Sequence, residues 1–464
     1  MFDTICDTVP ASGTMPPRVR RLEIFRRVLD GSIYNGLPYE FHEERNSAGE
    51  YVPLRLRKPS VRYGLCRIVV EDSVALLFSN AHFPTVESND PELRRVLADI
   101  ISETRMNEVM IDAAIRGSVG SVAILIRILN GRVFLSVLDS LYLTPQWDPQ
   151  APDTLKCVTE LYQVSGDALL TQGYAGVEPG ETYWFRREWD AVSETWYVPW
   201  PVNEPLAVPE LDAMRSITHG LGFVPIVWIK NLPGGDGIDG ACTFRAAIES
   251  NIEIDYQLSQ AGRGLKYSSD PTLLIKEPAL GDSEIVKSAG NALVVSEKGD
   301  AKLLEIGGTA SEAVISYVRT LREFALEAVH GNRSSADRLT TAQSGRALEM
   351  MNQGLIWLAD NLRISYGDGG LLAVVKMIVA ASNIYKLRVM GSDITPLNNA
   401  ERLTLRWPRW YPLSADDRLK EAQAILALVN AGQISKESAV KNLASTLGVM
   451  DVTAELKAIH EDGE

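Results

Sequence analysis

Cysteine is scarce in this sequence of 464 residues. Its four cysteines, Cys6, Cys66, Cys157 and Cys242, stand dozens of residues apart, and no Cys-x-x-Cys pair or local Cys/His cluster occurs. This spacing excludes a dense disulfide framework and a local zinc site. It indicates reduced thiols in a cytosolic setting.

Recognisable catalytic motifs are also lacking. The sequence has no GxxxxGK[ST] phosphate loop, no HExxH zinc motif and no GxSxG nucleophile turn. The five histidines show no partner in the sequence, so a surface or packing role is the default for each: His42, His82, His219, His330 and His460. We therefore expect no catalytic residue, no metal site and no cofactor, and we expect the protein not to be an enzyme.

The third deficit is in targeting signals, long apolar runs and positive charge. The first 20 residues hold Asp3, Asp7 and three prolines, which does not fit a signal peptide. The best membrane candidate, 371–381, is too short and contains Lys376, so we expect a soluble intracellular product. The net charge of −14 makes strong binding to nucleic acid through many phosphates improbable on this sequence. A protein with this charge can still surround nucleic acid without binding it tightly, because an inner surface lined by carboxylates would repel a duplex and let it slide.

The most informative stretch runs from 241 to 386. A first amphipathic helix is predicted over about 242–266, with Ile248, Ile252 and Tyr256 four residues apart. A small β insert with three short apolar runs follows at 271–306. A second helix, about 310–330, has a heptad-like seam made of Val314, Val318, Leu321, Ala325 and Ala328. Two such helices can stand as a pair, and neighbours in a ring of identical subunits would cover their remaining apolar faces.

The region from 21 to about 215 is predicted to be one α+β domain, with helices first and strands later. Residues 1–20 are expected to form a loose arm. Asp90 is a cap for a helix that begins at Pro91, and 67–78 is expected to be helical. Asn130-Gly131 predicts a hairpin between strands 121–129 and 132–138. Further strands are expected at 158–164, 182–188, 195–198 and 223–229.

A glycine-rich loop at 235–240 matches GxGxxG after a strand and before a helix, the context of a dinucleotide-binding turn. Asp236 and Asp239 would place carboxylates where a pyrophosphate must sit, and no series of βα units surrounds the loop. We favour a loop whose Asp239 caps the following helix. A dinucleotide-binding enzyme that uses this loop remains an alternative.

Polar loop 331–341 precedes a long helix predicted over 342–386, with a kink at Gly367–Gly370. A strand is expected at 402–407. Two helices then follow, over about 415–430, ending at Gly432, and from a Ser435 cap to about 443. A helix-turn-helix DNA reader is the alternative for this end, but four acidic residues favour a plain helical packing unit: Asp416, Asp417, Glu421 and Glu437.

The order of these parts resembles the portal proteins of tailed bacteriophages. The resemblance is carried by His219-Gly-Leu-Gly-Phe-Val-Pro-Ile-Val, by the helix–insert–helix unit, by Ser344-Gly-Arg-Ala-Leu-Glu and by Asn430-Ala-Gly-Gln-Ile-Ser with the stretch 448–459. It covers nearly the whole chain. It implies an α+β multi-domain portal fold: an arm at 1–20, a wing at 21–241, stem helices at 242–269 and 309–330, a clip at 270–308, a tunnel loop at 331–341, a long wing helix at 342–386, a wing return strand at 387–413 and a crown at 414–464.

The same resemblance implies a dodecameric ring at one capsid vertex of the virion, assembled in the host cytoplasm, through which double-stranded DNA passes without sequence readout. Implied partners are the terminase large subunit, a head-tail connector or adaptor, and the major capsid and scaffold proteins, but no membrane. Implied DNA-channel residues are Asn332, Arg333, Ser334, Ser335, Asp337 and Arg338. Implied docking residues in the clip are Lys276, Glu277, Asp282, Glu284 and Lys287. A virion or scaffold protein without a channel is the remaining alternative.

Overall fold

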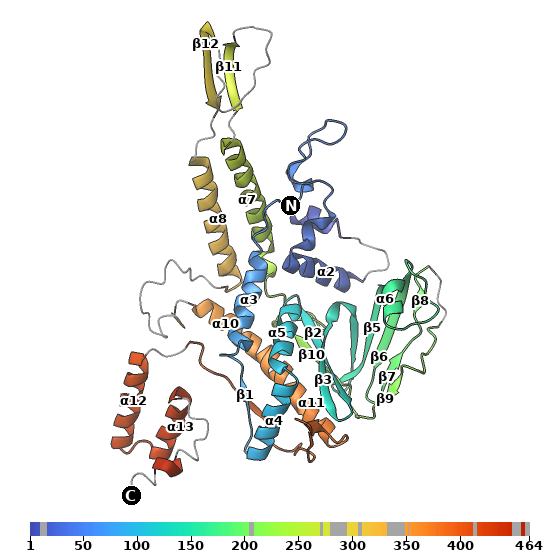
Figure 1. Cartoon of the computed structure of the whole chain (residues 1–464). Coiled ribbons are helices and arrows are strands. Elements are labelled where there is room, and N and C mark those ends of the chain that lie inside the picture. Colours follow the sequence, from blue (N-terminus) through green and yellow to red (C-terminus); the bar gives the residue numbers. More distant parts are fainter. Residues whose placement is uncertain are drawn as a thin grey trace. The chain divides into compact units, whose positions relative to one another are not determined.

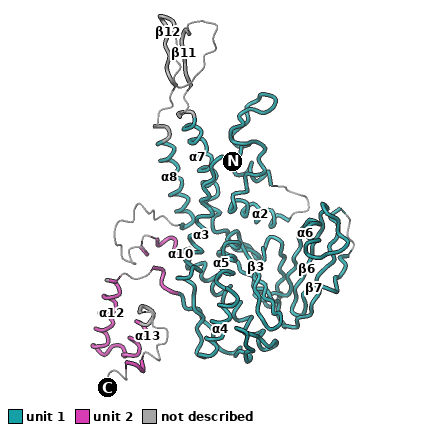
Figure 2. The backbone as a smooth tube through the Cα atoms, viewed as in Figure 1, with its two compact units in different colours: residues 1–331, 358–407 teal, residues 332–357, 408–464 magenta. Residues whose placement is uncertain are grey.

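The computed structural model describes residues 1–9, 16–203, 208–269, 272–278, 295–304, 309–331, 349–350, 352–411, 415–447 and 456–459. Helices and antiparallel sheets are both present (Figure 1), as expected for an α+β protein. The chain divides into two compact units, residues 1–331 with 358–407 and residues 332–357 with 408–464 (Figure 2).

The first unit begins with helices. They are α1 (Phe2–Cys6), α2 (Pro17–Asp30), the 3-10 turns η1 (Ser32–Gly36) and η2 (Leu54–Leu56), α3 (Leu65–Phe78), α4 (Pro91–Glu103) and α5 (Met106–Gly117). The predicted cap is confirmed, because the Asp90 carboxylate accepts hydrogen bonds from the Glu92 and Leu93 backbone N–H groups at 2.9 and 3.3 Å. The helix predicted at 67–78 is confirmed as α3.

The loose arm predicted at 1–20 is wrong for the residues that the structure describes. Ile5 and Val9 are buried, α1 packs against α7 and the 3-10 turns, and α2 already begins at Pro17. The charged residues and prolines suggested an arm, but the Ile5 and Val9 side chains are buried against other parts of the fold, including α7 far along the chain.

The strands follow in the second half of this region. They are β1 (Thr85–Glu87), β2 (Ser121–Leu129), β3 (Arg132–Asp139), β4 (Leu143–Trp147), β5 (Leu155–Ser165), β6 (Thr182–Trp189), β7 (Ser193–Trp196), β8 (Trp200–Pro201), β9 (Ile217–Thr218) and β10 (Ile226–Lys230), with η3 (Ser140–Tyr142) and α6 (Gly166–Thr171) between them. The Asn130-Gly131 hairpin is confirmed, and both residues have positive φ, of 52° and 81°.

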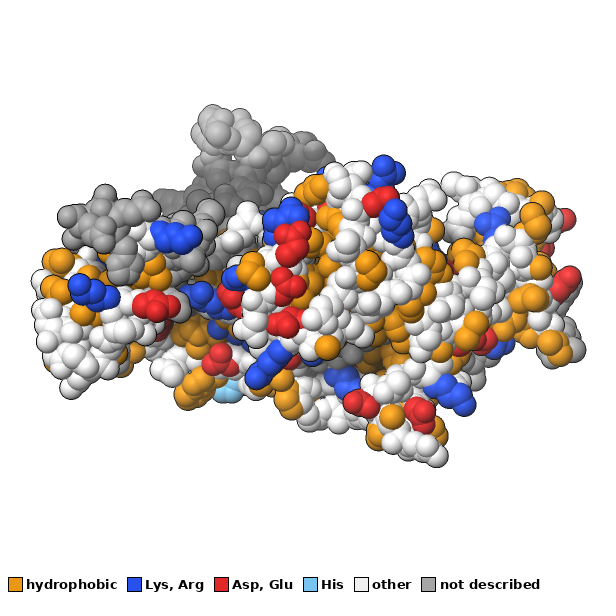
Figure 3. Space-filling view, turned by 90° about the horizontal axis from the view of Figure 1, so that it is seen from below, with side chains coloured by type: hydrophobic (Ala, Val, Ile, Leu, Met, Phe, Trp, Pro, Cys, Tyr) orange, Lys and Arg blue, Asp and Glu red, His pale blue; other side chains and the backbone are white. Residues whose placement is uncertain are grey.

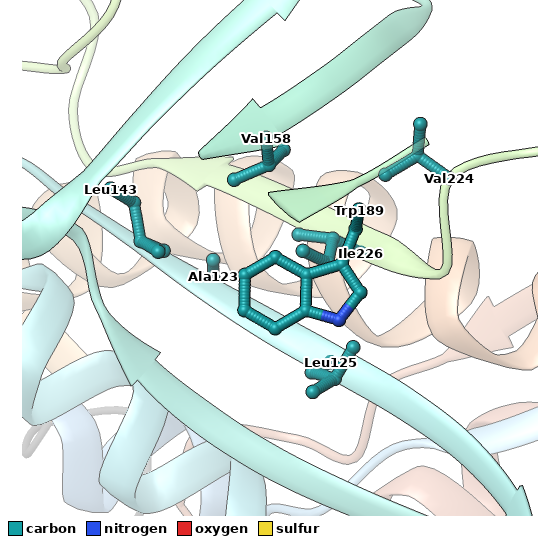
Figure 4. Close-up of a cluster of buried hydrophobic side chains, with 7 residues drawn as sticks. All are labelled: Ala123, Leu125, Leu143, Val158, Trp189, Val224 and Ile226. Carbon is teal, nitrogen blue, oxygen red and sulfur yellow. The ribbon is translucent and has the colours of Figure 1, made fainter. Parts of the chain in front are cut away.

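Two sheets face each other in the body of this unit. One has the order β10-β2-β3, and the other has the order β4-β5-β6-β7-β9 with β8 paired to β6. Trp189 lies at the centre of the apolar cluster that joins them (Figure 4), made of Ala123, Leu125, Leu143, Val158, Trp189, Val224 and Ile226. Helix α5, the π-helical segment η6 (Arg363–Leu371) and helix α11 (Leu372–Ser382) contact the three-stranded sheet. The resulting body is a layer of helices and two packed sheets.

The long helix of the prediction is interrupted. Residues 349–350 are helical and Asn352 is a turn, and then α10 (Gln353–Leu362), a π-helical segment η6 (Arg363–Leu371) and α11 (Leu372–Ser382) run continuously. The predicted irregularity at Gly367–Gly370 therefore falls inside a π-helical segment. A Cβ on Gly367 would lie 2.6 Å from Trp407, so only glycine lets the helix approach this ring without displacement.

By length and composition, Gln353–Ser382 passes as one candidate membrane span, longer than the apolar run seen in the sequence. More than half of its most apolar window, 56%, is buried inside the fold. Tyr366 and Leu371 are fully buried. A core helix has this same signature, so the finding is weak evidence for a membrane span.

The remaining elements are short strands and the helices of the second unit. They are β11 (Thr272–Pro278), β12 (Val295–Leu304), β13 (Arg388–Val389), β14 (Ser392–Asp393), β15 (Thr404–Arg406), α12 (Ala415–Asn430) and α13 (Lys436–Leu447). β15 pairs with β1 across more than 300 residues of sequence. In the second unit, Gly432 has φ 70° after α12, and the Ser435 hydroxyl accepts from the Ser438 N–H at 3.1 Å, as predicted for a stop and a cap.

The four cysteines are free thiols. Cys66 is buried, and Cys6, Cys157 and Cys242 are partly buried. Burial raises the pKa of all four, that of Cys242 to about 12. Acidic and basic side chains are interspersed on the face shown in Figure 3, so the net charge is not gathered into one acidic field there.

Candidate functional site

The candidate site is a pair of helices, α7 (Ile248–Ser269), preceded by the 3-10 turn η4 (Arg245–Ala247), and α8 (Thr309–Ala328). They pack against each other and extend away from the body (Figure 1). Both predicted helices are thus confirmed, although the first begins about six residues later than the sequence suggested. Ile248, Ile252 and Tyr256 are buried, as their spacing predicted.

A buried carboxylate fixes the base of α7. Asp255 is 1% exposed and accepts hydrogen bonds from the Tyr34 hydroxyl at 2.7 Å, the Tyr63 backbone N–H at 2.6 Å and the Asn251 amide at 3.2 Å. Burial raises the pKa of Asp255, and the hydrogen bonds from Tyr34 and Tyr63 act in the opposite direction. Because a buried polar group needs partners, these donors hold α7 in place about two turns after its start at Ile248.

Three further residues of α7 bind the segment between η1 and α3. The Tyr256 hydroxyl donates to the Arg57 carbonyl at 2.8 Å, and the Ser259 hydroxyl accepts from the Val61 N–H at 2.9 Å. Arg263 forms an ion pair with Glu44. Anchors are therefore spaced along α7 from Asp255 to Arg263, and this part of the helix is held over about two turns.

The predicted seam of α8 is confirmed in part. Ala325 is 2% exposed and Leu321 is half-buried, but Ala328 is exposed. Leu326 and Val329 are buried in its place, and Leu326 lies against Gly331. Val314 and Val318 are half-buried as well, so the heptad pattern holds from Val314 to Ala325. Beyond Ala325, contacts with the body of the first unit decide which side chains are buried.

Large apolar side chains remain exposed beside this seam. Phe324 is 63% and Tyr317 47% exposed, and they lie seven residues apart on one face of α8. Ile315 is exposed on another face, and Leu265 is exposed on α7. Two aromatic rings open to water in the single chain indicate a surface that another molecule covers. Sequence reasoning missed these residues, although the seven-residue spacing of Tyr317 and Phe324 was a usable signal.

The insert between the helices contains an antiparallel hairpin of β11 and β12, with Thr272 opposite Leu304. Lys276 and Glu277 lie on β11. The other predicted docking residues, Asp282, Glu284 and Lys287, lie outside the described residues. The predicted channel residues lie outside them as well, namely Asn332, Arg333, Ser334, Ser335, Asp337 and Arg338.

The glycine-rich loop does not have the geometry of a phosphate-binding turn. The Ile238 and Asp239 N–H groups donate to Asp236 at 2.9 and 2.7 Å, so these amides are already occupied. These bonds, with Arg21, lower the pKa of Asp236 to about 2. A Cβ on Gly235 would meet the Asp239 carbonyl at 2.1 Å, and one on Gly240 would meet the Asn231 nitrogen at 2.5 Å. These two glycines are explained by packing of the loop against its own backbone.

The predicted role of Asp239 as a helix cap is wrong. The next helical turn begins at Arg245, and Asp239 is 2% exposed beside Arg18, Arg21 and the Ser121 hydroxyl. A local cap was the simplest reading of an acid before a helix, but a buried acid near three donors binds them instead. Among the described residues no group of three or more His, Cys, Asp or Glu side chains could hold a metal ion.

Comparison with known proteins gives one family. The model of the family described as "Phage portal protein, SPP1 Gp6-like" matches residues 58–464. No curated protein matches the sequence. Among solved structures, a chain from the "Neck of native GTA particle computed with C12 symmetry" is 12% identical, with 93% of this chain and 94% of that chain covered and a TM-score of 0.41. A chain from the "Neck of empty GTA particle computed with C6 symmetry" is 11% identical, with 82% and 88% covered and a TM-score of 0.40.

Proposed function

Because the chain belongs to the SPP1 Gp6-like phage portal proteins, we propose that its copies form a closed ring, a dodecamer, at one vertex of a phage capsid. Double-stranded DNA passes through this ring during packaging and ejection. The chain acts as a structural channel subunit and performs no catalysis. It assembles in the host cytoplasm and resides in the virion.

The observation that supports ring formation is the exposure of Tyr317 and Phe324 on one face of α8 and of Ile315 on another. In a closed ring each subunit contacts its neighbours through two different patches, and α8 presents apolar side chains on two of its faces. A helix pair that is held at its base by Asp255 and exposed along its flanks meets this requirement. The aromatic residues are of the type that dominates binding energy at protein interfaces.

Native mass spectrometry and negative-stain electron microscopy of the purified full chain test this proposal. We expect closed rings with a central hole, with twelve copies as the main species. Only monomer at micromolar concentration, with no ring in the presence of capsid and scaffold proteins, would overturn it. Particles without a hole would favour the alternative of a virion protein that forms no channel.

The roles that we propose for the parts of the chain follow from its membership of this family. Residues 21–241 with 387–413 and the long helix at 342–386 form the wing, α7 and α8 form the stem, 270–308 the clip, 331–341 a tunnel loop and 414–464 the crown. The clip binds the terminase motor during packaging and the head-tail connector afterwards. The ring also binds the major capsid and scaffold proteins.

Replacing 270–308 by a short Gly-Ser linker should abolish binding of the terminase large subunit. The hairpin is a two-stranded sheet with two edges that can pair with a partner, and its removal leaves the α7 anchors of the first unit in place. A pull-down with the purified large subunit measures binding, and circular dichroism checks the fold. Undiminished capture of the large subunit would contradict the docking role.

Changing Arg333 and Arg338 together to alanine should reduce the DNA retained in particles while leaving ring assembly intact. Guanidinium groups bind phosphates well, and these are the cations of the polar stretch 331–341. Surface changes alter stability by less than about 0.5 kcal/mol, so the thermal midpoint should hold. DNA per particle is measured by gel analysis. A charge-conserving double change to lysine is the control, and full-length DNA in normal amounts in the alanine particles would count against contact with DNA.

A further inference from the structure

Two buried carboxylates take some of their hydrogen bonds from the first 57 residues and the others from the rest of the chain. Asp239 and Asp255 are 2% and 1% exposed, and both lie in the part of the chain that the family model matches, 58–464. Arg18 and Tyr34, which bind them, lie outside that part. Inside the matched part, Ser121 donates to Asp239, and Tyr63 and Asn251 donate to Asp255. Losing Arg18 or Tyr34 would still remove a strong donor from a buried carboxylate, which is destabilising.

The first anchor is at the beginning of α2. Nε and Nη2 of Arg18 donate to both oxygens of Asp239, each at 2.8 Å. Two further donations reach the carbonyls of Leu143 at 2.9 Å and Ser140 at 3.2 Å. A two-pronged arginine–carboxylate contact fixes direction as well as distance. The beginning of α2 is therefore joined to the glycine-rich loop and to the start of β4.

The second anchor lies just beyond the other end of α2. Gly31, with φ 75°, turns the chain into η1, where Tyr34 is 1% exposed and donates to Asp255 of α7. The Tyr34 ring also meets the Tyr256 ring edge-on, with centroids 6.2 Å apart. This end of the segment is joined to the base of the helix pair.

Between the anchors α2 is a rigid element. Its 14 residues span about 20 Å. Ile24 and Val28 are buried on one face and Leu22 on another, so the helix is held on more than one side. We propose that α2 is a connecting rod that couples the position of α7 to the glycine-rich loop 235–240 and the adjoining start of β4. Displacing α7 then strains the Arg18 contact, and releasing Arg18 frees α7. This coupling is a property of one chain and does not depend on the proposed ring.

Hydrogen–deuterium exchange on the full-length chain tests the rod. In Arg18→Ala, the amides of α7 from 251 to 262 should exchange roughly tenfold faster, although Arg18 makes its bonds at the opposite end of α2. A loss of protection of this size is expected when one charged hydrogen-bonded contact is removed. In Tyr34→Phe, the Asn231 and Gly240 amides, which donate to the Gly120 carbonyl at 2.9 and 2.8 Å, should exchange faster in turn.

Arg26→Ala is the matched control. Arg26 is on the same helix, but its side chain is 46% exposed and pairs with Asp139 rather than with a residue of either anchor. It should leave both distant regions unchanged. Circular dichroism identifies any variant that fails to fold; Arg18→Lys, which keeps a charge but loses the two-pronged contact, then replaces Arg18→Ala. Faster exchange confined to the residues that each changed side chain touches would overturn the coupling.

Discussion

Phe324→Asp should leave the purified chain monomeric under conditions where the unchanged chain forms rings. Phe324 is 63% exposed in the single chain, so the monomer tolerates the change. At a subunit contact, however, a carboxylate would replace a buried ring. An uncompensated charge in an apolar interface costs roughly 3 kcal/mol or more, or about two powers of ten in the affinity of each contact. A closed ring repeats that loss at every interface.

Size-exclusion chromatography with light scattering measures the effect. Met214→Asp is a control matched in chemistry, because Met214 is 95% exposed and lies away from the helix pair in sequence. Phe324→Leu should retain most of the assembly. If Phe324→Asp forms rings in normal yield, the exposed face of α8 is not a subunit contact, and the observation behind the proposed ring fails.

Trp189→Ala should lower the free energy of unfolding of the first unit by about 3–5 kcal/mol. The indole is fully buried and fills the space between the two sheets (Figure 4). It also carries the Arg187 guanidinium over its ring at 4.3 Å. Removing the indole leaves a cavity. It also removes a cation–π contact from the Arg187 guanidinium, which pairs with Glu160 at 2.7 Å.

Urea denaturation followed by circular dichroism gives the change in midpoint. Trp189→Phe keeps an aromatic ring in the same place and should lose less than half as much stability. A loss below about 1 kcal/mol for the alanine variant would mean that the two sheets do not rely on this side chain to pack together.

Local signals were sufficient for most of the elements. The Asn130-Gly131 turn, the Asp90 cap and the Ser435 cap were each predicted from a few adjacent residues, because the atoms that form a cap or a tight turn are neighbours in sequence. The two helices α7 and α8 followed from apolar spacing in the same way. The side chains predicted to be buried were correct except at Ala328, where contacts with the body of the first unit bury Leu326 and Val329 instead.

Long-range contacts escaped prediction. Arg18 and Asp239 are 221 residues apart, as are Tyr34 and Asp255, and no pattern in one sequence shows which arginine will meet which acid. Asp239 was accordingly taken for a cap, and residues 1–20 for a loose arm. The pairing of β1 with β15 was missed for the same reason. The roles proposed for the channel and clip residues stay predictions.

The raised thiol pKa values decide how the chain can be labelled with fluorophores. Cys66 is 1% exposed, and burial raises the pKa of Cys242 to about 12, so at neutral pH both thiols stay mainly in the unreactive protonated form. Maleimide dyes will therefore spare these two in the folded chain. Replacing only Cys6 and Cys157 by serine gives a background on which one introduced cysteine, placed for instance at the exposed position Leu265 of α7, reports distances between subunits by energy transfer.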